Sequence, residues 1–274
     1  MDPRVTVLMP VFNGEKYFDR ALPGILAQTL RDFELLVIDG GSTDRTPQML
    51  ASAASSDPRI RILTPGRMGF SESLNYGLSL ARGPYVARHD FDDTSTPIRF
   101  ARQVEFLEAH PDVGLVGGWY VVEDSIRHER FIRKQPLEHA AIVRVMAKGI
   151  PFADSLVMLR KQALVAAGGI AEARDIADLR TWIRVAQQGW KLANVPEVMG
   201  THYVYAGSNF QQAMHYRRRQ RELAGVQAQA VLRLRMPLWR LVFPASRLLY
   251  SALPVALKRF VRRRLAGWAE EDLP

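Results

Sequence analysis

The sequence predicts an α/β protein with a mostly parallel sheet, helices on both faces and a basic helical extension at the C-terminus. Over residues 5–117, short β-rich apolar runs alternate with longer helical patterns. Such alternation is typical of a sheet whose ligands collect beyond the carboxyl ends of its strands. The expected strands are Val5–Met9, Glu34–Ile38, Ile60–Leu63, Tyr85–His89 and Val113–Val116, and the expected helices are Glu15–Gln28, Asp44–Ala54, Ser71–Arg82 and Pro97–His110.

The rest of the chain divides at residue 208. Residues 118–208 lose the strand–helix rhythm, but no Pro/Gly/Ser-rich linker separates them from 1–117, so we expect 1–208 to form one domain. With 274 residues and 47% apolar content, the chain can bury a sizeable core. In the second part we expect strands at Trp119–Ile126 and Leu156–Leu159, and helices near Leu137–Ala147, Lys161–Ala167 and Asp178–Gln188.

The tail, 209–274, holds all of the excess positive charge. Of 37 Lys+Arg and 28 Asp+Glu, residues 211–274 hold 13 and 4, which leaves 24 and 24 for residues 1–210. Its apolar stretch is interrupted by Pro244, Arg247 and Pro254, which argues against a spanning helix. We expect amphipathic helices that lie on an anionic membrane surface.

Two other interpretations of the tail remain. One is an ordinary helical pair packed on the body with a solvated basic face. The other is nucleic-acid binding, which fits less well because the arginines alternate with Leu, Val and Trp at helical spacing. The chain has no cysteine, which excludes disulfide and thiolate chemistry. Its first residues lack the pattern of a signal peptide, so we expect a cytoplasmic protein at the inner face of the membrane.

Three carboxylates, those of Asp90, Asp92 and Asp93, follow the fourth expected strand, with only Arg88 nearby to neutralise them. Carboxylate oxygens suit Mg²⁺ or Mn²⁺, and phosphate oxygens usually complete the shell of such ions. The cluster therefore predicts a substrate that carries phosphate. The alternative is a solvated acidic turn that caps the helix beginning near Pro97.

Two further loops carry residues suited to a nucleotide. In Asp39-Gly-Gly-Ser-Thr-Asp44 the glycines allow close backbone approach, and Asp39 can accept hydrogen bonds from a base or ribose. In the first loop Phe12 can stack on a base. Glu15 either joins this site or is a first-turn residue favoured by the helix dipole. A plain turn followed by an N-cap would show the same residue types.

Taken together and in this order, residues 10–15, 37–44, 69–78 and 87–93 resemble the inverting nucleotide-sugar glycosyltransferases of family 2. The resemblance covers about residues 4–205. It implies a GT-A fold, a nucleoside-diphosphate sugar donor and Mn²⁺ or Mg²⁺, with 1–117 as the nucleotide-binding half and 118–208 as the acceptor side. It also implies that Asp92 binds the metal with support from Asp93. The nucleotide-binding residues implied are Pro10, Phe12, Glu15, Asp39, Arg67 and Asp90.

The resemblance also implies a catalytic base. Alignment on Trp182 places Asp178 at that position, with Ala177 where relatives usually carry Glu. A single carboxylate can deprotonate an acceptor hydroxyl and drive displacement with inversion. Asp175 is the reserve candidate, and an N-cap of the following helix is the alternative role for Asp178.

The chain departs from the family pattern at several positions. Gly40 stands where relatives often have a second Asp, and Tyr205 replaces a common His, whose contact His202 is a candidate to supply. Asp154 stands where many relatives have a His near the acceptor.

The function expected is metal-dependent inverting transfer from a nucleoside-diphosphate sugar, UDP-sugar first, to a hydroxyl of a glycan or lipid-linked acceptor in surface polysaccharide or glycoconjugate synthesis. One alternative is a nucleotidyltransferase, although the Gly-rich basic loop typical of that class is absent after the first strand. The other is a non-catalytic nucleotide-sugar-binding protein of the same fold.

Overall fold

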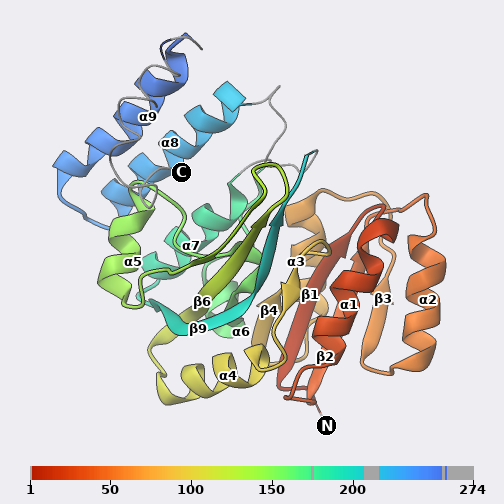
Figure 1. Ribbon diagram of the computed structural model, residues 1–274. Helices are drawn as coiled ribbons and strands as arrows, with labels where there is room; N and C mark the ends of the chain where they lie inside the picture. Colours follow the sequence, from red (N-terminus) through yellow and green to blue (C-terminus); the bar gives the residue numbers. More distant parts are fainter. Residues whose placement is uncertain (1, 174–175, 207–215, 255–256, 258–274) are drawn as a thin grey trace.

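The computed structural model describes residues 2–173, 176–206, 216–254 and 257. A nine-stranded sheet forms its centre, and helices cover both faces of the sheet (Figure 1). The strands are β1 Val5–Val11, β2 Phe33–Asp39, β3 Ile60–Leu63, β4 Tyr85–Arg88, β5 Thr94–Ser95, β6 Val113–Asp124, β7 Glu129–Arg133, β8 Met158–Arg160 and β9 Lys191–Val204.

The strand order is β3-β2-β1-β4-β8-β6-β9-β5, and β7 pairs with β6. Strands β1 to β4 are parallel to one another, as are β6 and β9, whereas β8 runs antiparallel between β4 and β6. The predicted α/β fold with a mostly parallel sheet is confirmed. The helices in the body are α1 Phe18–Leu26, α2 Thr46–Ser56, α3 Phe70–Leu80, α4 Arg99–Ala109, α5 His139–Met146, α6 Lys161–Ala166 and α7 Ala177–Gln187.

Both faces of the sheet are buried, which explains the nearly continuous apolar runs of the central strands. Alternate residues serve different layers: Leu8 packs in the layer formed with α3, α5, α6 and α7, whereas Val7 packs in the layer formed with α1, α2 and α4. Leu36 and Leu35 divide in the same way on β2. The sheet therefore holds its strand ends, and the loops that follow them, between two packed layers.

The second half differs from expectation in its strands. The two strands expected at Val113–Val116 and Trp119–Ile126 are one strand, β6, and β9 pairs with it in parallel along most of its length. The pattern did not predict β9, because Pro196 and Gly200 interrupt it and its alternation of burial is irregular. Gly200 allows close contact there, since an added Cβ would lie 2.1 Å from the Thr94 carbonyl oxygen.

The described part of the tail forms α8 Tyr216–Arg233, a 3₁₀ turn at Leu238–Leu241 and α9 Val242–Ala252. Helix α8 packs on α5 and α7 and buries Val226 and Val231 in the core. Arg247 on α9 donates to Gln227 and Gln220 of α8, so it is structural. Among the described residues, no helix is long and apolar enough to cross a bilayer. Residues 209–215, 255–256 and 258–274 of the expected tail lie outside the described residues.

Candidate active site

The loops after β1 and β2 are joined to each other by hydrogen bonds. The Gly14 amide donates to Thr46 Oγ1 at 2.8 Å, the Asn13 amide to Ser42 Oγ at 2.9 Å, and the Thr43 amide to Asn13 Oδ1 at 2.8 Å. These short side chains satisfy backbone donors that regular structure leaves free at strand ends. Two loops that are 30 residues apart in sequence therefore form one rigid edge.

Glu15 belongs to this joint. Its carboxylate accepts hydrogen bonds from the Arg45 amide at 3.1 Å and from Arg45 Nε at 2.7 Å, and Arg45 holds the pKa of Glu15 below its usual range. The residue was predicted to bind nucleotide. In the structure its carboxylate contacts Arg45 next to the start of α2 and so joins the two loops, and its binding of nucleotide stays a prediction.

The remaining donor-side residues lie around this edge. Asp39 is buried at the end of β2, and its Oδ1 accepts from the Ser42 amide at 2.9 Å. Phe12 is 55% exposed at the end of β1, so its ring is free to stack. An added Cβ on Gly41 would lie 3.8 Å from the Arg67 backbone nitrogen, so the loop after β3 reaches the same place. Pro10, in β1, pairs with Ile38 in β2.

The Asp cluster follows β4, which is adjacent to β1, so it meets these loops at the same end of the sheet. Asp93 is 1% exposed and its carboxylate is fully engaged by the second half of the chain: Oδ1 accepts from the Tyr203 amide at 3.0 Å, and Oδ2 contacts Ser155 Oγ and His202 Nδ1. Burial would raise the pKa of Asp93, but these partners lower it. Burial would lower the pKa of His202, but Asp93 outweighs burial and raises it to about 9.

Asp92 contacts the residue that follows β9. Its Oδ2 accepts from Tyr205 Oη at 2.7 Å, and its burial, together with Asp93, raises its pKa. Tyr205 and His202 therefore both reach carboxylates of the cluster. Within the described residues, no group of three or more His, Cys, Asp or Glu side chains is arranged to hold a metal ion. The donor set fits an ion held by one or two carboxylates and completed by phosphate oxygens, which is the usual arrangement for Mg²⁺.

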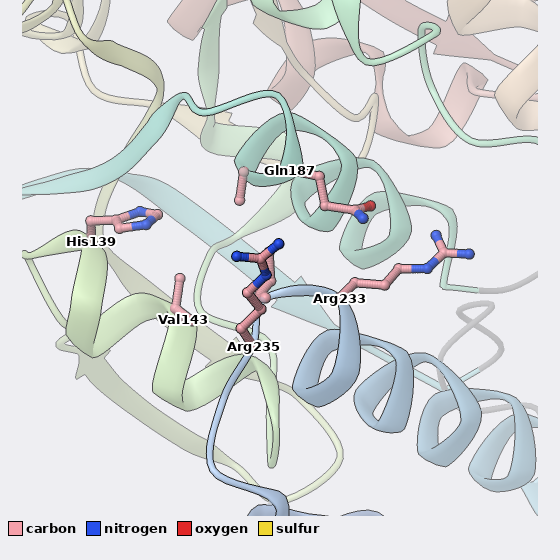
Figure 2. Close-up of a pocket in the computed structure, with 7 residues that line it drawn as sticks. His139, Val143, Gln187, Arg233 and Arg235 are labelled. Atoms are coloured by element: carbon pink, nitrogen blue, oxygen red, sulfur yellow. The ribbon is translucent and has the colours of Figure 1, made fainter.

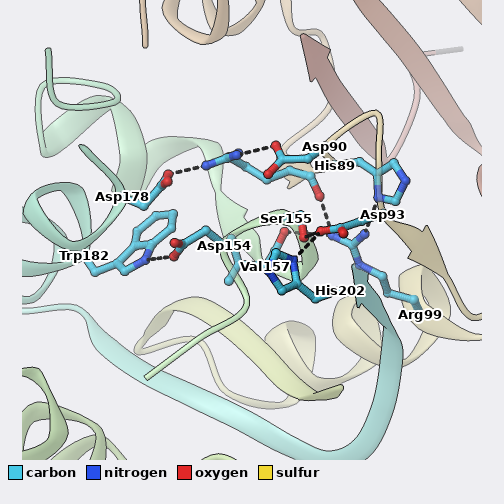
Figure 3. A network of polar contacts seen from close by, with 11 residues as sticks. His89, Asp90, Asp93, Arg99, Asp154, Ser155, Val157, Asp178, Trp182 and His202 are labelled. Carbon is cyan, nitrogen blue, oxygen red and sulfur yellow. Dashed lines mark hydrogen bonds and ion pairs between the residues drawn. The ribbon is translucent and has the colours of Figure 1, made fainter. Parts of the chain in front are cut away.

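Arg88 connects Asp90 of this cluster to Asp178, and Figure 3 labels both of these carboxylates. The side chain is fully buried at the end of β4; Nη2 donates to Asp90 Oδ1 at 2.6 Å, and Nη1 donates to Asp178 Oδ1. Burial would lower the pKa of Arg88, but Asp178 and Asp90 raise it, so the guanidinium stays charged. For Asp90 burial dominates and raises the pKa to about 6. One cation thus holds the expected ribose contact and the expected base in a fixed relation.

Asp154 is the third carboxylate of this neighbourhood. It begins a 3₁₀ turn, Asp154–Leu156, and its Oδ1 accepts from Trp182 Nε1 at 3.0 Å (Figure 3). Burial, and then the charge of Asp178, raise the pKa of Asp154 well above its usual range. Trp182 lies on α7 one turn after Asp178, so α7 carries both the candidate base and the side chain that positions Asp154.

A second buried arginine, Arg99, holds the backbone around the site. The sequence analysis did not identify it. Arg99 is fully buried; its Nη2 donates to the carbonyl oxygens of Arg88 at 2.7 Å and Val157 at 3.1 Å. Its Nη1 donates to Ser95 Oγ at 2.8 Å. The only sequence signal was its place in the first turn of α4, where a cation is unfavourable for the helix dipole.

The structure thus gathers most of the predicted residues at one end of the sheet. Donor-side residues and the Asp cluster lie on adjacent strands, and Asp178 joins them through Arg88. The reserve base, Asp175, lies outside the described residues.

Comparison with known proteins agrees with this geometry. Residues 6–167 match the family model described as glycosyl transferase family 2. EpsE of Bacillus subtilis, whose assignment as a glycosyltransferase is provisional, is 30% identical to this chain. The match covers 98% of this chain and 96% of EpsE. Amylovoran biosynthesis glycosyltransferase AmsE of Erwinia amylovora is 29% identical over 71% of this chain and 74% of its own.

Two solved structures share the fold. A mannosyltransferase from Pyrobaculum calidifontis, in complex with GDP-Man and Mn²⁺, has a TM-score of 0.64 at 22% identity and covers 99% of this chain and 82% of its own. TarS 1–349 of S. aureus, in complex with UDP-GlcNAc, has a TM-score of 0.64 at 15% identity, with 97% and 85% covered. Together with the family match over residues 6–167, these findings establish that the chain is a glycosyltransferase of family 2 with the GT-A fold.

Proposed function

We propose that the protein transfers a sugar from a nucleoside-diphosphate sugar to a hydroxyl group, with inversion and with the help of a divalent cation. The observation that carries this proposal is the Arg88 bridge. It places the carboxylate of Asp178 beside Asp90, and Asp90 is two residues from Asp92. A base and a diphosphate-binding carboxylate at such a junction suit a single displacement at the anomeric carbon.

The donor would lie across the rigid edge formed by the first two loops. Phe12 would stack on the base, Asp39 would accept a hydrogen bond from it, and Arg67 would approach from the third loop. Asp90 would contact the ribose, and Asp92, supported by Asp93, would hold Mn²⁺ or Mg²⁺. The ion supplies charge neutralisation to the diphosphate leaving group. UDP is our first choice of nucleotide, and GDP is the alternative, since the two solved neighbours contain UDP-GlcNAc and GDP-Man.

Asp178 would act on the acceptor. Its carboxylate accepts the proton of the acceptor hydroxyl as the oxygen forms a bond to the anomeric carbon, and the bond from that carbon to the diphosphate oxygen breaks on the opposite face. Arg88 is a positioning residue in this proposal, because it fixes the orientation of Asp178 through one hydrogen bond. The raised pKa keeps Asp154 neutral near pH 7, which spares Asp178 a second repelling charge.

The acceptor would be a glycan or lipid-linked glycan in surface polysaccharide synthesis. Support comes from AmsE, whose name refers to amylovoran biosynthesis, and from the basic tail. A net excess of 9 positive charges over residues 211–274, 13 against 4, would hold the enzyme at the cytoplasmic face of an anionic membrane.

Calorimetric titration with UDP and with GDP, each with and without Mn²⁺, tests the donor proposal. We expect one nucleotide to bind only with the metal, and Asp92→Asn to abolish that metal dependence. Asp19→Asn, which removes the same charge from the exposed surface of α1, is the matched control and should bind like the wild type. Metal-independent binding, or binding of neither nucleotide, would contradict the proposal.

A further inference from the structure

A basic cavity lies at the far end of α7 from the candidate base. It is open to solvent, has a volume of about 410 Å³ and is lined by the start of α5, the end of α7 and the residues that end α8 (Figure 2). Gln187 lines it, whereas Asp178 begins the same helix. At a rise of about 1.5 Å per residue, the two ends of α7 are about 15 Å apart. The cavity is therefore separate from the active site.

The cavity carries unbalanced positive charge. Arg233 and Arg235 line it, and neither side chain forms an ion pair or a hydrogen bond within the described part of the chain. None of the described residues that line it is acidic. His139 adds a donor, since its Nδ1 accepts from the Leu192 amide at 3.1 Å and its proton therefore sits on Nε2. Arg235 points between α5 and α7, whereas Arg233 points away from it along the same pocket (Figure 2). Either guanidinium group can bind a phosphate group that enters the pocket.

The backbone at Arg235 gives a second, independent indication. Its φ is +51°, in the left-handed region, and the Met236 amide donates to the Val231 carbonyl oxygen at 2.9 Å, so this residue ends α8 where glycine is usually found. An arginine is unfavourable in that conformation. Figure 2 shows its side chain between α5 and α7, so the strained residue points its charge into the cavity.

The chain that leaves the cavity is apolar and exposed. Leu238 is 66% exposed and Trp239 is 61% exposed, three and four residues after Arg235, and Val242 and Leu249 on α9 are also exposed. Tryptophan next to cationic residues is typical of segments at the headgroup level of a bilayer. A free phosphate in solution would leave these apolar side chains unexplained, whereas a phospholipid accounts for both features.

We propose that this cavity binds the phosphate of an anionic phospholipid headgroup, while Leu238 and Trp239 enter the membrane interface. The inference rests on the proposed membrane association and gives it a defined site. It orients the enzyme with the ends of α7 and α8 toward the lipid, and the active site one helix length away. A lipid-linked acceptor would then reach Asp178 from the same surface.

The test compares three full-length proteins in co-sedimentation with vesicles of about 30% phosphatidylglycerol in phosphatidylcholine. The cavity variant is Arg233→Gln with Arg235→Gly; glycine suits the backbone there, so its melting temperature should not fall. The control, Arg4→Gln with Arg31→Gln, removes the same charge near the starts of β1 and β2, where the Arg4 amide donates to the Asp32 carbonyl oxygen. At about fivefold per arginine, we expect a loss of about 25-fold for the cavity variant and little change for the control.

Equal losses in the two variants would show general charge attraction and would overturn the proposal, as would full binding by the cavity variant. Titration with inorganic phosphate separates the two sources of phosphate chemistry: cavity-dependent binding of phosphate without cavity-dependent vesicle binding would overturn the lipid assignment. If the wild type does not bind vesicles, the proposed membrane association is wrong, and the lipid assignment with it. UDP titration of the same proteins reports on the donor site independently.

Discussion

The donor-side loops and the Arg88 cluster are stabilised in opposite ways. The loops after β1 and β2 are joined mostly by hydrogen bonds between short side chains and backbone amides, such as Gly14 to Thr46, and the ion pair of Glu15 with Arg45 lies at the surface. In the cluster, the single guanidinium of Arg88 is shared by Asp90 and Asp178, with Asp154 close by. The first two loops are thus held by backbone and short side-chain contacts, whereas the Arg88 cluster is held by charge.

Replacing the candidate base should have the largest effect, and this effect should fall on transfer and not on nucleotide binding. We expect Asp178→Asn to lower transfer by about 10³-fold, within the usual range for a general base, because the amide cannot take the proton. Nucleotide affinity should change less than about twofold, since donor contacts lie in other loops. Single-turnover transfer and UDP titration measure the two quantities, and near-normal turnover would remove Asp178 from the base role.

Removing the cation should destabilise the acceptor side as a unit. Arg88→Met leaves the carboxylates of Asp90 and Asp178 without their partner, and we expect a loss of about 3 kcal/mol in the free energy of unfolding. Arg61→Met is the control: it also faces a buried carboxylate, that of Glu34, but Arg82 remains as a second partner. Urea denaturation measures the free energy of unfolding of both variants. Equal losses would show that Arg88 contributes no more to stability than Arg61 does.

The pH dependence of the melting temperature should show that ionised Asp154 destabilises the fold. The folded-state pKa of Asp154 is raised, so its contribution is present at low pH and is lost as the pH rises through that value. Asp154→Asn mimics the neutral form, so its melting temperature should exceed that of the wild type by about 3 °C at pH 8 and by much less near pH 4. A constant difference at all pH values would contradict this account, because Asp90 titrates in both proteins.

The donor loops should respond most to backbone changes. Gly41 has φ +88°, and Gly189, in the turn after α7, has φ +86° with open space around its Cβ position. Alanine at either position should cost about 1 kcal/mol, since both would adopt a left-handed conformation. Only Gly41→Ala should also weaken UDP binding, and calorimetry on the two variants checks this. Similar affinities would show that the loop is less rigid than its hydrogen bonds suggest.

Periodicity predicted the first half well because each strand there is buried on both faces and bounded by a helical pattern. Strands β1 to β4 lie within a few residues of their expected positions. It failed for β7, whose five residues are all exposed and carry no apolar alternation. The Asp cluster was visible as local composition, whereas the contact of Arg88 with Asp178 joins residues 90 apart in sequence and depends on the fold. Resemblance alone identified Asp178.

The pairing of β9 with β6 has a consequence for the order of folding. Strands β1 to β4 and the first loops lie within the first 88 residues, so they can form early during synthesis. Three of the partners that fix Asp93 and Asp92, namely His202, Tyr203 and Tyr205, come more than 100 residues later. We therefore expect the nascent chain to have nucleotide loops before it has a fixed metal site, so that premature termination would produce a protein able to fold in part but unable to catalyse transfer.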